Sequence, residues 1–159
     1  MQNFGINKII KITTPEISNK LNIKFKRLNC WINRGYINPT IKNTGAGTKL
    51  GYTILDIYLI ELFSQLLSRG FSREISSKCI NSNLRENVSH LRDLEYKEYW
   101  LSFSFITVNG EDCIHNMIFH YGIDKFYFAA MEKDIYIINF NRIMAKVNDA
   151  FGFVAGSIR

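Results

Sequence analysis

A stretch of 39 residues without any acidic side chain, from Ile17 to Leu55, constrains this chain most. It contains seven lysines and arginines and so carries a charge of +7, whereas the whole chain of 159 residues carries +6. All other residues together therefore sum to −1. Apolar residues recur within the stretch at helical spacing, which predicts one buried face and one basic face. A surface of this kind indicates a polyanionic partner, and nucleic acid is the first candidate.

Two short helices joined by a tight turn are predicted around the start of this stretch. Thr13 and Glu16 have the spacing of a capping box, and Thr14 followed by Pro15 is an alternative helix start. The first helix is short, and Asn22 suits the turn that follows it.

The second helix is expected over residues 25–34, and Gly35 suits its end because glycine readily adopts the left-handed conformation. Its apolar residues fall on one face at helical spacing: Phe25, Leu28, Trp31 and Ile32. Phe25 and Trp31 could stack on bases, but this spacing favours core positions for both. The opposite face is basic and polar, as in the recognition helix of a helix-turn-helix that enters the major groove.

Residues 41–52 are expected to form a short hairpin with a glycine-rich tip at 43–47, which would serve as a wing. Lys42 and Lys49 flank this tip. Glycines let backbone N–H groups approach phosphates closely, and the lysines add charge.

A long apolar helix is predicted next, with Thr53 as its cap and Asp56 in its first turn. It should end at Gly70. Ser72 is expected to cap a further helix, which the polar residues at 81–83 would break.

The second half of the chain has the pattern of antiparallel strands. Residues 99–106 alternate with period two, and Asn109 followed by Gly110 is a strong hairpin signal. The return strand is expected at 112–119. A second hairpin would pair residues 126–130 with 135–140.

After these strands, Asn141 is expected to cap a final helix that stops at Gly152. The expected fold class is therefore α+β: an N-terminal winged helix-turn-helix followed by a small antiparallel β-sheet plus a C-terminal helix.

Three segments are expected: a DNA-binding domain over residues 1–83, a helical linker over 84–97 and an α+β domain over 98–159. Twelve of the 22 aromatic residues lie between positions 96 and 140. They either form the core of the last domain or line a dimer, ligand or partner surface.

The first half, over residues 12–80, resembles the winged helix-turn-helix domain of the MerR family. Positions typical of the family's helix-turn-helix are occupied by Ile23, Leu28, Trp31, Gly35 and Tyr36. Positions typical of the segment after its wing are occupied by Tyr52, Thr53, Asp56, Gly70, Phe71 and Ser72. Asn29 and Leu50 stand where the family usually has arginines. The resemblance implies a winged DNA-binding domain, but the long dimerisation helix of the family has no counterpart over residues 72–96.

Sequence-specific binding to double-stranded DNA, as in a transcriptional regulator, is the leading hypothesis. Four side chains of the second helix are expected to read base edges: Lys26, Arg27, Asn29 and Asn33. The others are expected to contact phosphates: Lys20, Lys24, Arg34, Lys42, Lys49 and Tyr52. A homodimer formed through the C-terminal domain would bind an inverted repeat.

Two alternatives remain open on the sequence. The first is an excisionase-like architectural factor of a mobile element, which bends DNA. The second is a sensor or protein-interaction module that acts through the C-terminal aromatic sheet.

No enzyme motif is present, so we expect neither catalysis nor a cofactor. Cys30, Cys79 and Cys113 are too few and too scattered for a disulfide framework. Cys79 is expected to be a small buried residue, and Cys113 with His115 lacks a third metal ligand. The chain has neither a signal-peptide-like start nor a stretch of about 18 apolar residues, so a cytoplasmic, nucleoid-associated protein without a membrane partner is expected.

Overall fold

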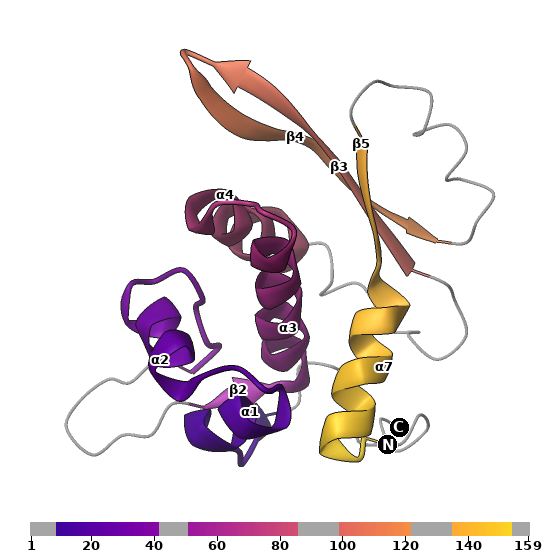
Figure 1. The fold of residues 1–159 in the computed structure, drawn as a ribbon. Helices are drawn as coiled ribbons and strands as arrows, with labels where there is room; N and C mark the ends of the chain where they lie inside the picture. The colour runs from indigo at the N-terminus through magenta and orange to yellow at the C-terminus, as the bar shows by residue number, and fades with distance from the viewer. Residues whose placement is uncertain (1–8, 42–50, 86–98, 122–134, 154–159) are drawn as a thin grey trace.

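The computed structural model describes residues 9–41, 51–85, 99–121 and 135–153 (Figure 1). The chain is a mixed α+β structure, as the sequence predicted at this level. In chain order the elements are β1 (Ile9–Ile10), α1 (Thr14–Lys20), α2 (Phe25–Asn33), β2 (Tyr52–Thr53), α3 (Ile54–Ser68), α4 (Arg73–Lys78), the π-helix η1 (Cys79–Leu84), β3 (Tyr99–Val108), β4 (Glu111–Tyr121), β5 (Ile135–Asn139) and α7 (Phe140–Phe151).

Local signals at the ends of α1 and α2 are confirmed. Thr13 caps α1 in a capping box, in which its backbone N–H donates to Glu16 Oε2 over 2.7 Å. Asn22 takes a positive φ of 55° in the turn between the two helices. Gly35 follows α2 with a φ of 72°, which favours glycine because a side chain is strained there.

A small sheet joins the N-terminus to the start of α3. β1 pairs with β2 in antiparallel register, with Ile9 opposite Thr53. Ile41 and Gly51 form a further antiparallel bridge. A Cβ atom at Gly51 would lie 2.7 Å from Ile41 Cδ1, so this close approach requires glycine. The tip of the predicted wing and the lysines that flank it, Lys42 and Lys49, lie outside the described residues.

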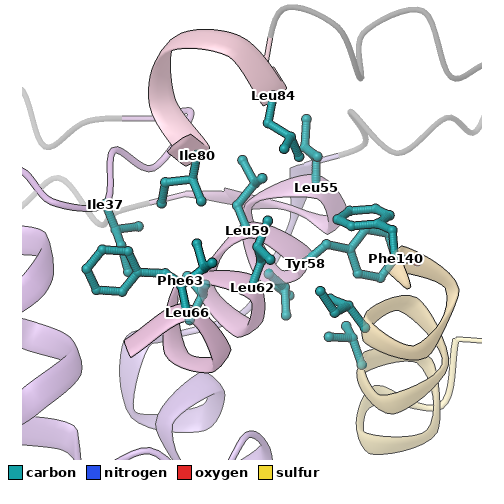
Figure 2. Packing of buried hydrophobic residues seen from close by; sticks show 14 of the residues in the cluster. Ile37, Leu55, Tyr58, Leu59, Leu62, Phe63, Leu66, Ile80, Leu84 and Phe140 are labelled. Atoms are coloured by element: carbon teal, nitrogen blue, oxygen red, sulfur yellow. The ribbon is translucent and has the colours of Figure 1, made fainter. Parts of the chain in front are cut away.

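Helix α3 lies at the centre of the core, and residues from the loop after α2, from η1 and from α7 surround it (Figure 2). It begins with the predicted cap, which is a full capping box of Thr53 and Asp56. A helix that is apolar nearly all round is buried on every side. Accordingly Phe63 packs edge-on against Trp31 of α2, with 5.0 Å between ring centroids, and Tyr58 packs against Phe140 of α7 at 6.2 Å.

The larger sheet has the strand order β4-β3-β5, and all its pairs are antiparallel. Asn109 and Gly110 have φ values of 53° and 82°, so the predicted hairpin turn between β3 and β4 is confirmed. The end of this hairpin projects away from the helices (Figure 1). The strand predicted at 126–130 lies outside the described residues.

The predicted cap of the last helix was wrong by two residues. Asn139, not Asn141, caps α7, and its side chain accepts from the N–H of Arg142. Asn141 instead accepts from the backbone N–H of Tyr99 over 2.6 Å, which ties α7 to the first residue of β3. Gly152 ends the helix with a φ of 68°, as predicted.

The predicted break at 81–83 was also wrong. Helix α4 runs directly into η1, and Arg85 is still helical. The side-chain amide of Asn81 donates to the carbonyl of Tyr36 over 2.9 Å and to Ser77 Oγ over 3.0 Å. The side chain of Asn81, which was expected to break the helix, therefore bonds to the preceding helical turn and to the loop after α2.

The two halves of the chain share one cluster of buried residues, which extends from Ile17 to Val147. Helix α7 lies beside α3 (Figure 1), and Tyr58 Oη donates to Asn148 Oδ1 over 2.8 Å. Lys146 forms an ion pair of 2.6 Å with the buried carboxylate of Glu61. The division into domains stays a prediction, since residues 86–97 of the predicted linker lie outside the described part.

Replacement of Phe140 by alanine tests whether this core is shared. Phe140 is fully buried, so we expect F140A to lose about 3–5 kcal/mol of unfolding free energy. Urea unfolding followed by circular dichroism should show one cooperative transition at a lower midpoint. Phe25, which is 47% exposed, gives the matched control F25A, with a loss below about 1 kcal/mol. Two separate transitions, or an F140A loss no larger than that of F25A, would contradict a shared core.

Candidate nucleic-acid interface

Helix α2 is fixed to the rest of the molecule by one narrow face. Leu28 and Trp31 are buried, and Ile32 is partly buried against the same core. The other side of the helix is open to solvent. It carries exposed Lys26, Arg27, Cys30 and Asn33, with partly exposed Asn29, and exposed Lys24 and Arg34 flank its ends.

The charges on this face are not neutralised by the part of the chain that the structure describes. Two ion pairs occur there, and they join Asp56 to Arg85 and Glu61 to Lys146. Both acids belong to α3, and neither meets a cation of α2. Uncompensated cations on one face of a helix create a local positive potential that attracts polyanions.

Arg27 lies on the flank of α2 that faces α4. Its guanidinium lies over the ring of Trp31, 4.9 Å from the centroid, in a cation–π contact. The side chain borders an open depression of about 350 Å³ whose other lining residues are Leu67, Phe71, Ser72, Arg73 and Glu74. Arg73 was not among the predicted site residues, because its place at the start of a capped helix gave no sign that it lies beside Arg27.

The expected core position of Phe25 was wrong, since its side chain is 47% exposed. At 100° per residue, Phe25 lies about 120° around the helix from Trp31. The buried face centres on Leu28 and Trp31, which leaves the first residue of the helix at its margin.

Tyr52 was wrongly expected to contact phosphate. It is fully buried in β2, and its hydroxyl lies 2.7 Å from Thr14 Oγ1. Burial raises the pKa of this phenol above its ordinary value. Tyr52 therefore belongs to the core, where the pairing of β2 with β1 places it.

Lys20 is exposed, but its ammonium group contacts the end of α7 rather than standing with the cations of α2. Its Nζ donates to the carbonyl of Ala150 over 2.8 Å and lies 5.1 Å from the ring centroid of Phe151. A cation at a helix C-terminus is stabilised by the helix dipole. Lys20 thus links α1 to α7.

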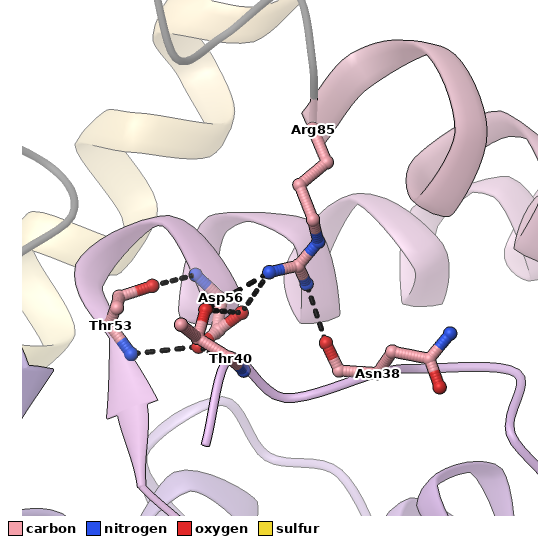
Figure 3. Close-up of polar contacts among 5 residues, drawn as sticks. All are labelled: Asn38, Thr40, Thr53, Asp56 and Arg85. Atoms are coloured by element: carbon pink, nitrogen blue, oxygen red, sulfur yellow. Dashed lines mark hydrogen bonds and ion pairs between the residues drawn. The ribbon is translucent and has the colours of Figure 1, made fainter. Parts of the chain in front are cut away.

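The buried carboxylate of Asp56 connects the loop after α2 to α3 (Figure 3). Its Oδ2 accepts from the backbone N–H groups of Thr53 at 2.8 Å and Thr40 at 3.0 Å. Its Oδ1 accepts from Thr40 Oγ1 and pairs with Arg85 Nη1 at 2.8 Å. Arg85 also donates to the carbonyl of Asn38 over 2.6 Å. The sequence had indicated only the helix-capping role of Asp56.

Two cysteine side chains, Cys30 and Cys79, are among those that the structure describes. Cys30 is exposed on α2, whereas Cys79 is buried as expected, and burial raises the pKa of its thiol to about 12. The described residues contain no group of three or more potential metal-ligating side chains. No helix in the described part of the chain is long and apolar enough to cross a membrane.

No protein-family model matches this chain, and no curated protein matches it at a significant level. The resemblance to the MerR family therefore rests on the residues quoted for it and stays a prediction.

Removal of the Asp56 carboxylate should loosen the base of the 38–41 loop. We expect D56A to lose about 2–4 kcal/mol of unfolding free energy, because it leaves Arg85 and two amide groups without their acceptor. The value is below that of a fully buried pair since the Arg85 side chain is 26% exposed. Urea unfolding measures the loss, and hydrogen exchange at the Thr40 amide should accelerate.

The matched control is D149A, which removes an exposed carboxylate from α7. It should change the unfolding free energy by less than about 0.5 kcal/mol. If D56A were no more destabilising than D149A, the Asp56 network would not fix this loop.

Proposed function

We propose that this protein binds double-stranded DNA sequence-specifically through α2 and acts as a transcriptional regulator with a winged helix-turn-helix. The single observation that carries the proposal is the outer face of α2. Six exposed residues at or near it are basic, polar or small, and none of its cations meets an acid within the described residues. A helix of this size and charge suits the major groove.

The order and spacing of α1 and α2 support the helix-turn-helix part of the proposal. Four residues separate the two helices, and Trp31 and Leu28 hold the second one on α3 with its polar side outward. The bridge between Ile41 and Gly51 brings the ends of residues 42–50 together. That closure supports a wing that carries Lys42 and Lys49 to the phosphate backbone.

The contacts are assigned by position around α2. Lys26, Asn29 and Asn33 lie along the exposed side and are assigned to base edges. Arg27 is reassigned to phosphate, because its stack on Trp31 directs it along the flank beside exposed Arg73. Lys24 and Arg34, at the two ends, are also assigned to phosphates.

The proposed partner arrangement is a homodimer formed through the C-terminal half. A second copy would place a second α2 on an inverted repeat. Because α2 and the wing are assigned to DNA, the contact between subunits is assigned to the C-terminal half. The elements described in that half are β3, β4, β5 and α7.

Binding is tested with full-length protein and duplexes selected from a random 30-base-pair library, followed by fluorescence anisotropy. With about five phosphate contacts in each subunit, log Kobs should fall with log salt at a slope of about −4 to −5 for one bound subunit and about twice that for a bound dimer. N33A should lose about 10- to 100-fold in affinity for the selected duplex and little for random duplex, because asparagine reads a base edge without charge.

The matched control is N19A, which removes an exposed asparagine from α1 and should leave discrimination between the two duplexes unchanged. Absence of salt-dependent binding to any duplex would contradict DNA binding. Equal losses for N33A on selected and random duplexes would contradict base reading by α2.

A further inference from the structure

Phe25 is a large apolar side chain exposed within a polar surface. Three large hydrophobic residues of the described part are strongly exposed: Ile9, Phe25 and Tyr136. Tyr136 stacks with Phe103 at 5.7 Å between centroids, and Ile9 lies in the paired strand β1. For Phe25 the described residues provide neither a ring partner nor a strand, so its exposure has no local structural explanation.

The neighbours of Phe25 indicate the chemistry of what covers it. Exposed Lys24 and Lys26 flank it in sequence, and Asn29 follows one helical turn later on the same side. A surface that combines an exposed ring with two nearby lysines and a carboxamide one turn later suits a ligand that is anionic overall and offers both an apolar group and hydrogen-bonding groups. An apolar protein groove would leave both cations without partners.

The major groove of duplex DNA at A·T pairs offers this combination. Phosphates supply the negative charge, thymine presents its C5 methyl group, and adenine presents N7 and the N6 amino group. Phenylalanine contacts the thymine methyl, and asparagine forms a bidentate pair with adenine. The first turn of a recognition helix is also the part that reaches base edges.

We propose that Phe25 packs against the C5 methyl group of thymine and, with Asn29 on adenine, selects A·T pairs under the first turn of α2. This inference rests on the proposed DNA binding and specifies which bases that site takes. Contact between the ring and the methyl group removes apolar surface of both from water, which is favourable. This contact favours thymine over any pyrimidine that lacks the C5 methyl group.

Replacement of thymine by uracil removes only the C5 methyl group and leaves base pairing intact, so it isolates this contact. Full-length protein is titrated into the selected duplex, synthesised once with thymine and once with uracil throughout. We expect wild-type protein to bind the uracil duplex about three- to tenfold more weakly. F25A should bind both duplexes equally, with the affinity that wild-type protein has for the uracil duplex.

Two further variants make the test specific. F25L keeps an apolar side chain and should retain a reduced preference for thymine. I9A removes an exposed hydrophobic residue far from α2 in sequence and should keep the full wild-type preference. The comparison of the two duplexes with wild-type protein needs no substitution, so it tests the contact independently of any variant.

The outcomes separate this inference from the function on which it rests. Failure of every duplex to bind contradicts DNA binding itself. Specific, salt-dependent binding with equal affinity for thymine and uracil duplexes overturns only the role of Phe25. A preference for thymine that persists in F25A also overturns it, since the methyl group would then act on another residue or on DNA shape.

Discussion

The buried carboxylate of Asp56 is the interaction on which the arrangement of the N-terminal half depends. A buried charge is costly unless it is paired and hydrogen-bonded. Here the two backbone amides of Thr53 and Thr40, the hydroxyl of Thr40 and the guanidinium of Arg85 meet these requirements. The same group therefore caps α3, fixes the loop that follows α2 and anchors the end of η1.

The placement of the acids explains why the positive charge concentrates on α2. Asp56 and Glu61 both lie on α3, and each pairs with a cation from later in the chain, Arg85 and Lys146. Glu16 is engaged in the cap of α1 and Glu74 accepts from Tyr36. Of these acids, Asp56 and Glu61 are buried, and exposed Glu74 borders the same depression as Arg27 without forming an ion pair with it. The cations of α2 remain available to an external polyanion, which the proposed function assigns to DNA.

Sequence patterns predicted those features that depend on neighbours along the chain. Helix ends, the hairpin turn and most helix caps are fixed by a few adjacent residues, so they were predicted correctly: Gly35, Thr53, Ser72, Asn109 with Gly110, and Gly152. At the start of α1 the sequence left Thr13 and Thr14 open, and Thr13 is the cap. The predicted cap at Asn141 was the exception, because Asn141 bonds instead to Tyr99 of β3. Features set by contacts between residues far apart in the sequence were not predicted. Asn81 continues a helix because it bonds to Tyr36, and Tyr52 is buried because β1 pairs with its strand. Helical periodicity placed Phe25 in the core. Periodicity does not show that the first turn of α2 extends beyond the residues that it packs against. The positions that matter for DNA are exposed ones, and these follow from tertiary packing.

The most direct measurement of the central claim is amide NMR of the full-length protein during titration with a selected DNA duplex. We expect chemical-shift changes to concentrate in α2, in the turn before it and at the α4 residues beside Arg27. Signals from the outward side of α7 should stay in place. Changes that concentrate instead in β3, β4 and β5, or a titration that leaves α2 unaffected, would contradict the claim that α2 is the DNA-binding surface.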